Sequence, residues 1–246
     1  MPDHGSLTAA NHPFTLPAVA PLYPPPPWPL ENAQILMMTF EIDKRLAIKW
    51  LPANLTRPNP AYAQVQVAHY PSTPVGPFTV AHQFLMSRLR VLPRSIPFQC
   101  IVDNPDALPA LREVWGYPAK LGKVSLELRS DRITASVERP AGQALCTLAL
   151  TEMRPLGPGD LRYDPQLSLR LTPRAQATRP PEYAQLVQID PTYTFKEAYR
   201  GKGAIDYPSR SEADPWFLVE MLDFIAITYA VCDTELPWAR FLEAFP

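Results

Sequence analysis

Glycine is scarce in this sequence, with only 9 among 246 residues, and none of them forms a closely spaced phosphate-binding motif. The sequence also lacks an apolar run of the roughly 20 residues that a membrane-spanning helix needs. Its N-terminus has neither the basic start nor the apolar core of a secretory signal. These absences argue against a nucleotide-cradling loop and a membrane segment, and we expect a cytoplasmic protein.

Charge and cysteine are also limited. Charged residues make up 19% of the chain and the formal net charge is -1, which leaves no excess of basic residues for nucleic acid or a membrane surface. The cysteines Cys100, Cys146 and Cys232 occur in separate apolar runs, without the spacing of metal sites or redox pairs. We therefore expect buried free thiols, no metal site, and neither a nucleic-acid nor a membrane partner.

Proline, in contrast, is abundant, with 32 residues. Because proline removes a backbone donor and is excluded from helix interiors and central strands, we expect short elements and many extended connections. Hydrophobic residues make up 46% of the chain, enough to form a packed core at this length. No repeat or break in composition divides residues 31–246, which we interpret as a single domain.

The first 30 residues contain the densest prolines, including the run Pro24–Pro27. Such a segment is predicted to be extended and polyproline-like. Its apolar residues Phe14, Leu16, Tyr23 and Trp28 indicate that it packs on the domain or on a partner subunit. We thus expect a proline-rich extended leader at 1–30, followed by the domain at 31–246.

The remaining pattern is mostly that of strands. Residues 63–70 alternate strictly between apolar and polar, as a half-buried strand does. Asp43 is a candidate N-cap for a short helix over 44–51, a second helix is expected from 104–106 to Gly116, and a short terminal helix over 236–245. Residues 217–231 fit either a strand or a helix. Strands are expected at 34–42, 96–102, 124–129, 132–138, 144–152, 167–171, 183–189 and 192–199. This pattern predicts a mainly β (α+β) fold in which an antiparallel sheet closes on itself.

Residues 112–124 (REVWGYPAKLGKV) form the most distinctive segment of the chain. A helix-like run ends at Gly116, a proline bend follows, and Lys120 stands at the start of a strand. The pattern Arg-Glu-x-x-x-Tyr-Pro-x-Lys-Leu-Gly resembles the signature of the acetoacetate decarboxylase-like superfamily, whose members carry a Schiff-base lysine in a Tyr-Pro-Lys-Lys-Leu segment. Residues 35–52, 76–80 and 198–201 also look similar to that family. The resemblance implies a closed β-barrel or cone with a few short helices, and a homo-oligomer.

Three functional positions of the family differ in this chain. Ala119 stands where the nucleophilic lysine would be, and Lys120 matches the second, neighbouring lysine. Val80 replaces a glutamate, and residues 32–34 contain no arginine for a substrate carboxylate. The loss of these charges predicts a larger and more apolar cavity, because an uncompensated buried charge costs several kcal/mol. A small keto acid such as acetoacetate is therefore not the expected substrate.

Lys120 is the leading catalytic candidate, because an amine inside an apolar barrel loses its proton and can then form an imine or abstract an α-proton. Glu113 is a candidate for positioning protons, and Tyr117 for donating a hydrogen bond to an enolate oxygen. The structural alternatives are an ion pair between Lys120 and Glu113 and a Tyr117 ring packed on Pro118. The candidate substrate-binding residues are Arg112, Val80, Phe78, Trp115, Phe84 and His82.

Together, the resemblance and the expected cavity predict an enzyme without a cofactor that acts on an apolar, keto or polyketide-like carbonyl compound. Its reaction would use enamine or enolate chemistry, as in cyclisation, dehydration, aldol-type cleavage or isomerisation. Two alternatives stay open. One is a cyclase that acts by shape alone, with Lys120 as a bystander. The other is a non-catalytic protein that binds a small hydrophobic ligand.

Overall fold

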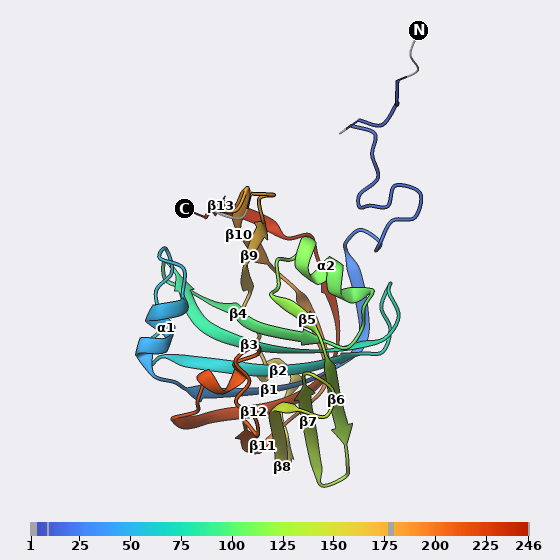
Figure 1. The fold of residues 1–246 in the computed structure, drawn as a ribbon. Coiled ribbons are helices and arrows are strands. Elements are labelled where there is room, and N and C mark those ends of the chain that lie inside the picture. The colour runs from blue at the N-terminus through green and yellow to red at the C-terminus, as the bar shows by residue number, and fades with distance from the viewer. Residues whose placement is uncertain (1–3, 9, 177–179, 246) are drawn as a thin grey trace.

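The computed structural model describes residues 4–8, 10–176 and 180–245, and strands dominate it (Figure 1). The two α-helices in this part of the chain are α1 (Lys44–Trp50) and α2 (Ala107–Glu113). Two single 3₁₀ turns, η1 (Pro158–Asp160) and η2 (Trp216–Leu218), lie in connections. The strands are β1 (Trp28–Glu41), β2 (Tyr62–Tyr70), β3 (Phe78–Leu89), β4 (Leu92–Val102), β5 (Ala119–Leu121), β6 (Lys123–Leu128), β7 (Arg132–Glu138), β8 (Ala144–Pro155), β9 (Gln166–Thr172), β10 (Tyr183–Ile189), β11 (Thr192–Asp206), β12 (Asp223–Leu236) and β13 (Arg240–Ala244).

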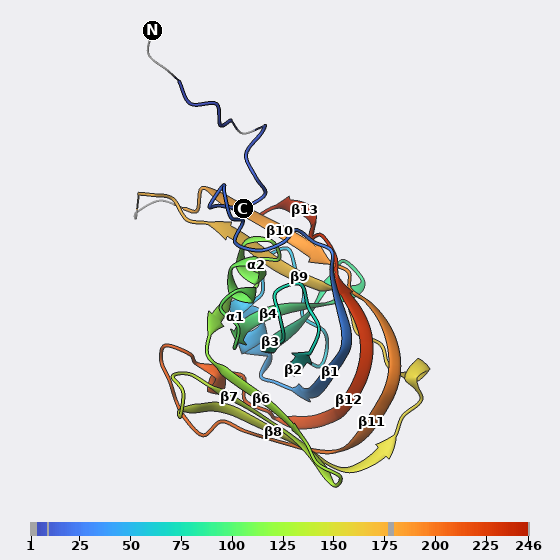
Figure 2. The same ribbon diagram turned by 90° about the vertical axis from the view of Figure 1, so that its right-hand side faces the viewer.

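All of these strands belong to one sheet of 13 strands, in the order β13-β10-β9-β4-β3-β2-β1-β12-β11-β8-β7-β6, with β5 paired to β4. Pairing is antiparallel except where β4 meets β5 and β9. The sheet curls round so that β6 lies against β2, β3 and β4 (Figure 2). The predicted mainly β, barrel-like or cone-like fold is confirmed. Within the described ranges, however, side-chain packing rather than hydrogen bonding closes the curl.

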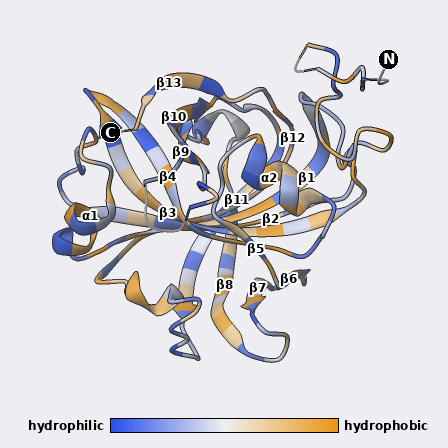
Figure 3. Ribbon diagram, turned by 45° about the horizontal axis from the view of Figure 1, so that its top comes forward, coloured by the Kyte–Doolittle hydropathy of each residue, from blue (hydrophilic) through white to orange (hydrophobic). Residues whose placement is uncertain are grey.

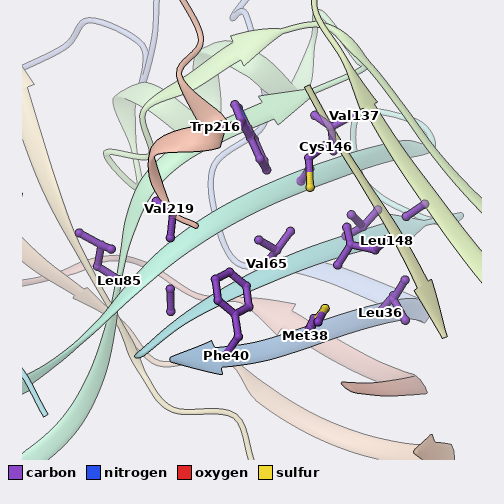
Figure 4. Close-up of a cluster of buried hydrophobic side chains, with 14 of the residues drawn as sticks. Leu36, Met38, Phe40, Val65, Leu85, Val137, Cys146, Leu148, Trp216 and Val219 are labelled. Carbon is purple, nitrogen blue, oxygen red and sulfur yellow. The ribbon is translucent and has the colours of Figure 1, made fainter. Parts of the chain in front are cut away.

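Both faces of strands β1 to β4 are covered in their central parts, and β3 is buried along nearly its whole length, including its polar residues His82 and Gln83. The first core lies inside the curl, where Phe40 and Val65 meet Leu148 of β8 and Trp216 of η2 (Figure 4). The second core lies on the opposite face, under α2 and the segment that follows it. Hydrophobic residues accordingly run along the central strands in Figure 3, whereas α1 carries several hydrophilic ones.

Two of the three predicted helices are present. The side chain of Asp43 caps α1 by accepting a hydrogen bond from the Arg45 backbone N–H at 2.8 Å. Gly116 follows α2 with a φ of +70°, and an added Cβ there would meet the Arg170 backbone at 3.0 Å, so glycine is required. The terminal helix predicted over 236–245 is wrong. Residues 240–244 form β13 instead, because their backbone pairs with β10.

The leader contacts α2 and the connection between β12 and β13 through its aromatic residues. Tyr23 is buried, and its hydroxyl donates to Glu113 Oε2 at 2.5 Å. The ring of Phe14 lies 5.8 Å from that of Tyr23 and 5.3 Å from that of Trp238. Strand β1 already begins at Trp28, two residues before the expected end of the leader, and the boundary at residue 30 stays a prediction.

Two further expectations concern cysteines and membranes. The three cysteines are free and buried, as predicted. Among the described residues, no helix combines the length and the hydropathy that crossing a membrane requires.

Candidate active site

Several candidate side chains on neighbouring strands lie on the same face of the sheet, the face that carries the second core. Phe78, Val80 and His82 are alternate residues of β3, so their side chains share this face. On β2, Gln66 lies directly opposite His82. On the other side, Cys100 of β4 pairs with both His82 and Ala119. The sheet therefore brings Val80, His82 and Ala119, which are distant in sequence, onto one face.

A small cavity lies over this face, between the sheet and α2. Its free space is only ≈ 20 Å³, about enough for one water molecule. The described residues that line it carry no charged side chain. They are Leu30, Gln66, Tyr70, Phe78, Val80, His82, Leu111, Tyr117, Gln166, Pro191, Tyr193, Thr234 and Leu236. Aromatic rings and two glutamine side chains fill much of the space, and a cavity larger and more apolar than in the rest of the family stays a prediction.

His82 is the most unusual polar group in the cavity. Its side chain is 5% exposed, and its Nδ1 has no hydrogen-bond partner among the described residues. The ring stacks on Phe84 at 5.0 Å and lies 4.9 Å from the ring of Tyr117. Burial without a compensating charge lowers the pKa of His82 to about 3. The imidazole is therefore neutral near pH 7 and offers one N–H donor and one acceptor nitrogen.

Tyr117 supplies a hydroxyl beside His82. The hydroxyl donates to Gln166 Oε1, and burial raises the pKa of the phenol well above its usual value. The loop that carries Tyr117 is fixed by backbone contacts: Tyr117 N–H donates to Leu111 O at 2.9 Å, and Ser168 Oγ donates to Gly116 O at 2.7 Å. Tyr117 thus stays protonated and is held in place as a hydrogen-bond donor.

Lys120 lies on the other face of the sheet. Successive residues of β5 point to opposite faces, so Ala119 is buried toward the cavity and Lys120 is directed away from it. The Lys120 Nζ donates to Asp214 Oδ1 at 2.8 Å and to Ala213 O at 2.6 Å, and the side chain is 44% exposed. The expectation of an enclosed, deprotonated amine is therefore wrong. The alternative ion pair with Glu113 is wrong as well, because the partner is Asp214.

Comparison with known proteins identifies the family of this chain. The model of a family described as acetoacetate decarboxylase (ADC) matches residues 11–244. This chain belongs to the acetoacetate decarboxylase family. Membership supports an enzymatic function on a carbonyl compound. Ala119, which the sequence resemblance places where the family has its lysine, is buried on the same face of the sheet as the cavity.

Individual relatives are distant in sequence but similar in structure. An acetoacetate decarboxylase of Chromobacterium violaceum is 24% identical over 228 residues, which cover 91% of each chain. Decarboxylase DEC1 of Cochliobolus heterostrophus is 22% identical over 91% of this chain and 93% of its own. The crystal structure of acetoacetate decarboxylase from Legionella pneumophila matches with a TM-score of 0.86 at 19% identity, covering 100% of this chain and 99% of the other. The enduracididine biosynthesis enzyme MppR, complexed with pyruvate, matches with a TM-score of 0.78 at 16% identity, covering 95% of this chain and 98% of the other.

The other candidate residues divide into two groups in this family member. Phe78, Val80, His82 and Tyr117 line the cavity, and Phe84 stacks against His82. Arg112, Glu113 and Trp115 hold the surrounding loops instead. Arg112 Nη1 donates to Ala119 O at 2.8 Å, Glu113 accepts from Tyr23, and Trp115 Nε1 donates to Pro237 O at 2.7 Å.

Several cavity residues have no counterpart among the predicted site residues. In the alternating strand predicted over 63–70, a polar residue such as Gln66 is expected to face solvent. In the structure, α2 and its neighbours cover that face of the sheet as well. Gln166 lies at the start of β9 and Thr234 near the end of β12, and no local pattern marks either one. The Thr234 Oγ1 is buried and has no hydrogen-bond partner in the described part of the chain.

No metal site is evident at the cavity. Within the described ranges, no group of three or more His, Cys, Asp or Glu side chains is arranged to hold a metal ion.

Proposed function

We propose that this member of the acetoacetate decarboxylase family catalyses cofactor-free proton transfer on an uncharged carbonyl compound bound in the cavity. The main support is the buried Nδ1 of His82, which has no hydrogen-bond partner among the described residues and belongs to a ring that lies 4.9 Å from the ring of Tyr117. Buried polar groups are nearly always hydrogen-bonded, and an exception needs an explanation. A ligand oxygen or an acidic C–H group would supply that partner.

The reaction would be an enolisation followed by return of the proton. The C–H bond next to the carbonyl breaks, its proton goes to the acceptor nitrogen of His82, and the electron pair moves onto the carbonyl oxygen. Because burial lowers the pKa of His82 to about 3 without a ligand, the imidazolium that forms depends on the negative charge of the enolate beside it. The Tyr117 hydroxyl, released from Gln166, donates a hydrogen bond to this oxygen where negative charge develops. His82 then returns the proton to another carbon, which gives an isomer. Alternatively, the enolate carbon bonds to a second carbonyl carbon of the same molecule, and the alkoxide that forms takes the proton from His82, which gives cyclisation.

An imine mechanism is less well supported by the geometry. The amine of Lys120 points away from the cavity and is bound by Asp214, and the cavity-facing neighbour is an alanine. An amine that donates to a carboxylate on the other face of the sheet does not reach a carbonyl carbon in the cavity. Covalent catalysis by Lys120 would therefore require β5 to turn so that the Lys120 side chain points toward the cavity.

Exchange of α-protons with solvent tests the proposal directly. The protein is incubated with uncharged ketones in deuterated water, and loss of the α-proton signals is followed by NMR. Lys120→Ala is expected to retain exchange and His82→Phe to lose it. Absence of exchange for every ketone tried, with a folded protein, would contradict the proposal.

Borohydride trapping separates the imine mechanism from enolisation. We expect no adduct on the wild-type chain and an adduct in Ala119→Lys, which puts an amine on the cavity face and serves as a positive control, provided that circular dichroism shows it folded. An adduct on Lys120 in the wild-type chain would favour the imine mechanism instead.

A ligand-binding protein without catalysis is the second candidate. The free space of ≈ 20 Å³ and the absence of charged side chains among the described lining residues favour it. Ligand binding without proton exchange would distinguish this function from the first.

A further inference from the structure

The residues that line the cavity differ along β3. They extend from Phe78 to His82, four residues apart, which corresponds to about 13 Å of strand. At one end His82 lies opposite Gln66, and at the other Phe78 lies opposite Tyr70. Leu30 and Thr234, which pair with each other, extend the second end further.

Polar groups gather at the His82 end. The ring of Tyr117 lies 4.9 Å from that of His82, and its hydroxyl is hydrogen-bonded to Gln166. The side chain of Gln66 points to the same face beside them. This end therefore offers several hydrogen-bonding groups, none of them charged, and we refer to it as the polar end.

The other end is lined mainly by apolar side chains, with Leu30, Leu236 and Phe78 buried. Its hydroxyl groups come from Tyr70, Tyr193 and Thr234, and only the last is a buried group without a partner. A chain of methylene groups laid along this part would replace water with apolar contacts.

We propose that the cavity selects an elongated, uncharged ligand whose carbonyl oxygen binds at the polar end and whose unbranched apolar chain extends over Val80 and Phe78 toward Leu30 and Leu236. This inference rests on the proposed function, because it takes the cavity as the substrate site. A carboxylate is disfavoured, since no described lining residue supplies the cation that a buried anion needs. The side chains along the cavity must rearrange on binding, since its free space is only ≈ 20 Å³.

The test is a binding series on the wild-type protein. Straight-chain 2-alkanones of increasing length are compared with alkanoates of the same length by titration calorimetry near pH 7. Affinity for the ketones is expected to rise roughly fourfold per methylene until the chain fills the apolar end. Alkanoates are expected to bind at least about 100-fold more weakly. Equal affinity for the two series, or ketone affinity independent of length, would overturn the ligand class.

Two substitutions test the orientation. His82→Phe removes the polar group but keeps a flat ring against Phe84, and we expect about tenfold weaker ketone binding. His69→Phe is the matched control: it makes the same change at a histidine of β2 whose Nδ1 is hydrogen-bonded to Thr79 Oγ1 at 3.1 Å and which does not line the cavity, and there we expect less than a twofold effect. An equal loss of ketone binding in both variants, or no loss in His82→Phe, would overturn the proposed orientation.

Failure of the ligand class and failure of the proposed function give different results. If ketones bind with the expected length and charge dependence but exchange no α-protons, the catalytic function fails and the ligand class stands. If α-protons exchange but alkanoates bind as tightly as ketones, the catalytic function stands and the ligand class fails.

Discussion

Neighbouring residues of the same strands meet opposite environments on the two faces of the central sheet. On β3, His82 faces the cavity with an unpartnered nitrogen, whereas Gln83 faces the first core. Gln83 Nε2 donates to Trp216 O at 3.0 Å, and its Oε1 accepts from Gln99 Nε2 at 2.8 Å. In the described part of the chain, the protein thus supplies partners for the Gln83 side chain and none for His82 Nδ1, and in the first core Trp216 Nε1 is also without a partner.

The same contrast holds on β5. Lys120 is paired with Asp214, whose side chain is 4% exposed and also meets Arg139 at 3.2 Å. These contacts tie the connection between β11 and β12 to the sheet, and η2 in that connection places Trp216 in the first core. The side chain of Ala119, the preceding residue, has no polar group. Charged residues near a family motif can therefore be structural, and a neutral residue with an unmet hydrogen bond is the better candidate for chemistry.

The largest expected effect that tests this comparison comes from His82→Phe. Proton transfer by a positioned side chain typically contributes 10²- to 10⁴-fold, so we expect at least a 100-fold loss of α-proton exchange. The melting temperature should stay the same or rise, because the substitution removes a buried polar atom that has no partner. Exchange rates by NMR and thermal unfolding check both expectations. A normal exchange rate would remove His82 from the mechanism.

Next in size is Asp214→Ala on the opposite face. Loss of the carboxylate that holds Lys120 and Arg139 is expected to lower the free energy of unfolding by about 2–3 kcal/mol. Because none of these residues lines the cavity, α-proton exchange per folded molecule should be unchanged. Urea titration measures the first quantity and NMR the second. Loss of exchange in folded Asp214→Ala would show that the two faces are coupled.

A pH dependence of stability distinguishes the buried histidine from the solvated charges. The pKa of His82 is about 3 in the folded chain, below the 6.5 of the unfolded chain, so the unfolded state binds a proton that the folded state does not. Stability must therefore fall as the pH drops below 6.5. Between pH 7 and pH 5 this group alone accounts for about 2 kcal/mol.

The matched control is His82→Phe, which lacks the titrating group while keeping every exposed carboxylate. Between pH 7 and pH 5, we expect the unfolding free energy of His82→Phe to fall by about 2 kcal/mol less than that of the wild-type chain. Identical pH profiles for the two proteins would mean that His82 is not buried as a neutral group.

The smallest expected effect is that of Gln83→Leu. It leaves the Trp216 carbonyl and the Gln99 amide without their partner in a dry core, so we expect a loss of about 1–2 kcal/mol in unfolding free energy. Set beside His82→Phe, it compares adjacent buried polar residues of one strand by urea titration. If both substitutions changed stability equally, the contrast between the faces would not hold.

Much of the fold could be predicted from local pattern. Strict alternation marked residues 63–70, Asp43 marked the start of α1, and the 112–124 segment indicated the family. The terminal segment 240–244 could not be assigned, because its pairing with β10 depends on backbone partners far away in the sequence. The strand over 223–236 was ambiguous for a similar reason, since a long apolar run fits either element.

Within the site, the sequence identified His82, Tyr117, Val80 and Phe78 as candidates but gave the central role to Lys120. The motif fixes which residues are adjacent in the chain, and strand alternation then forces Ala119 and Lys120 onto opposite faces. Which of the two faces holds the cavity depends on what covers each, and no local pattern reports that.

The sequence by itself determined the family, the strand-rich architecture and the absence of a lysine at residue 119, because these follow from residue identity and short-range periodicity. Only the tertiary structure decided that Lys120 is held by Asp214 and that His82, Gln66 and Gln166 share a cavity. Hydrogen-bond satisfaction is a property of the groups that surround an atom in space, and in a sheet those groups come from strands far apart in the chain.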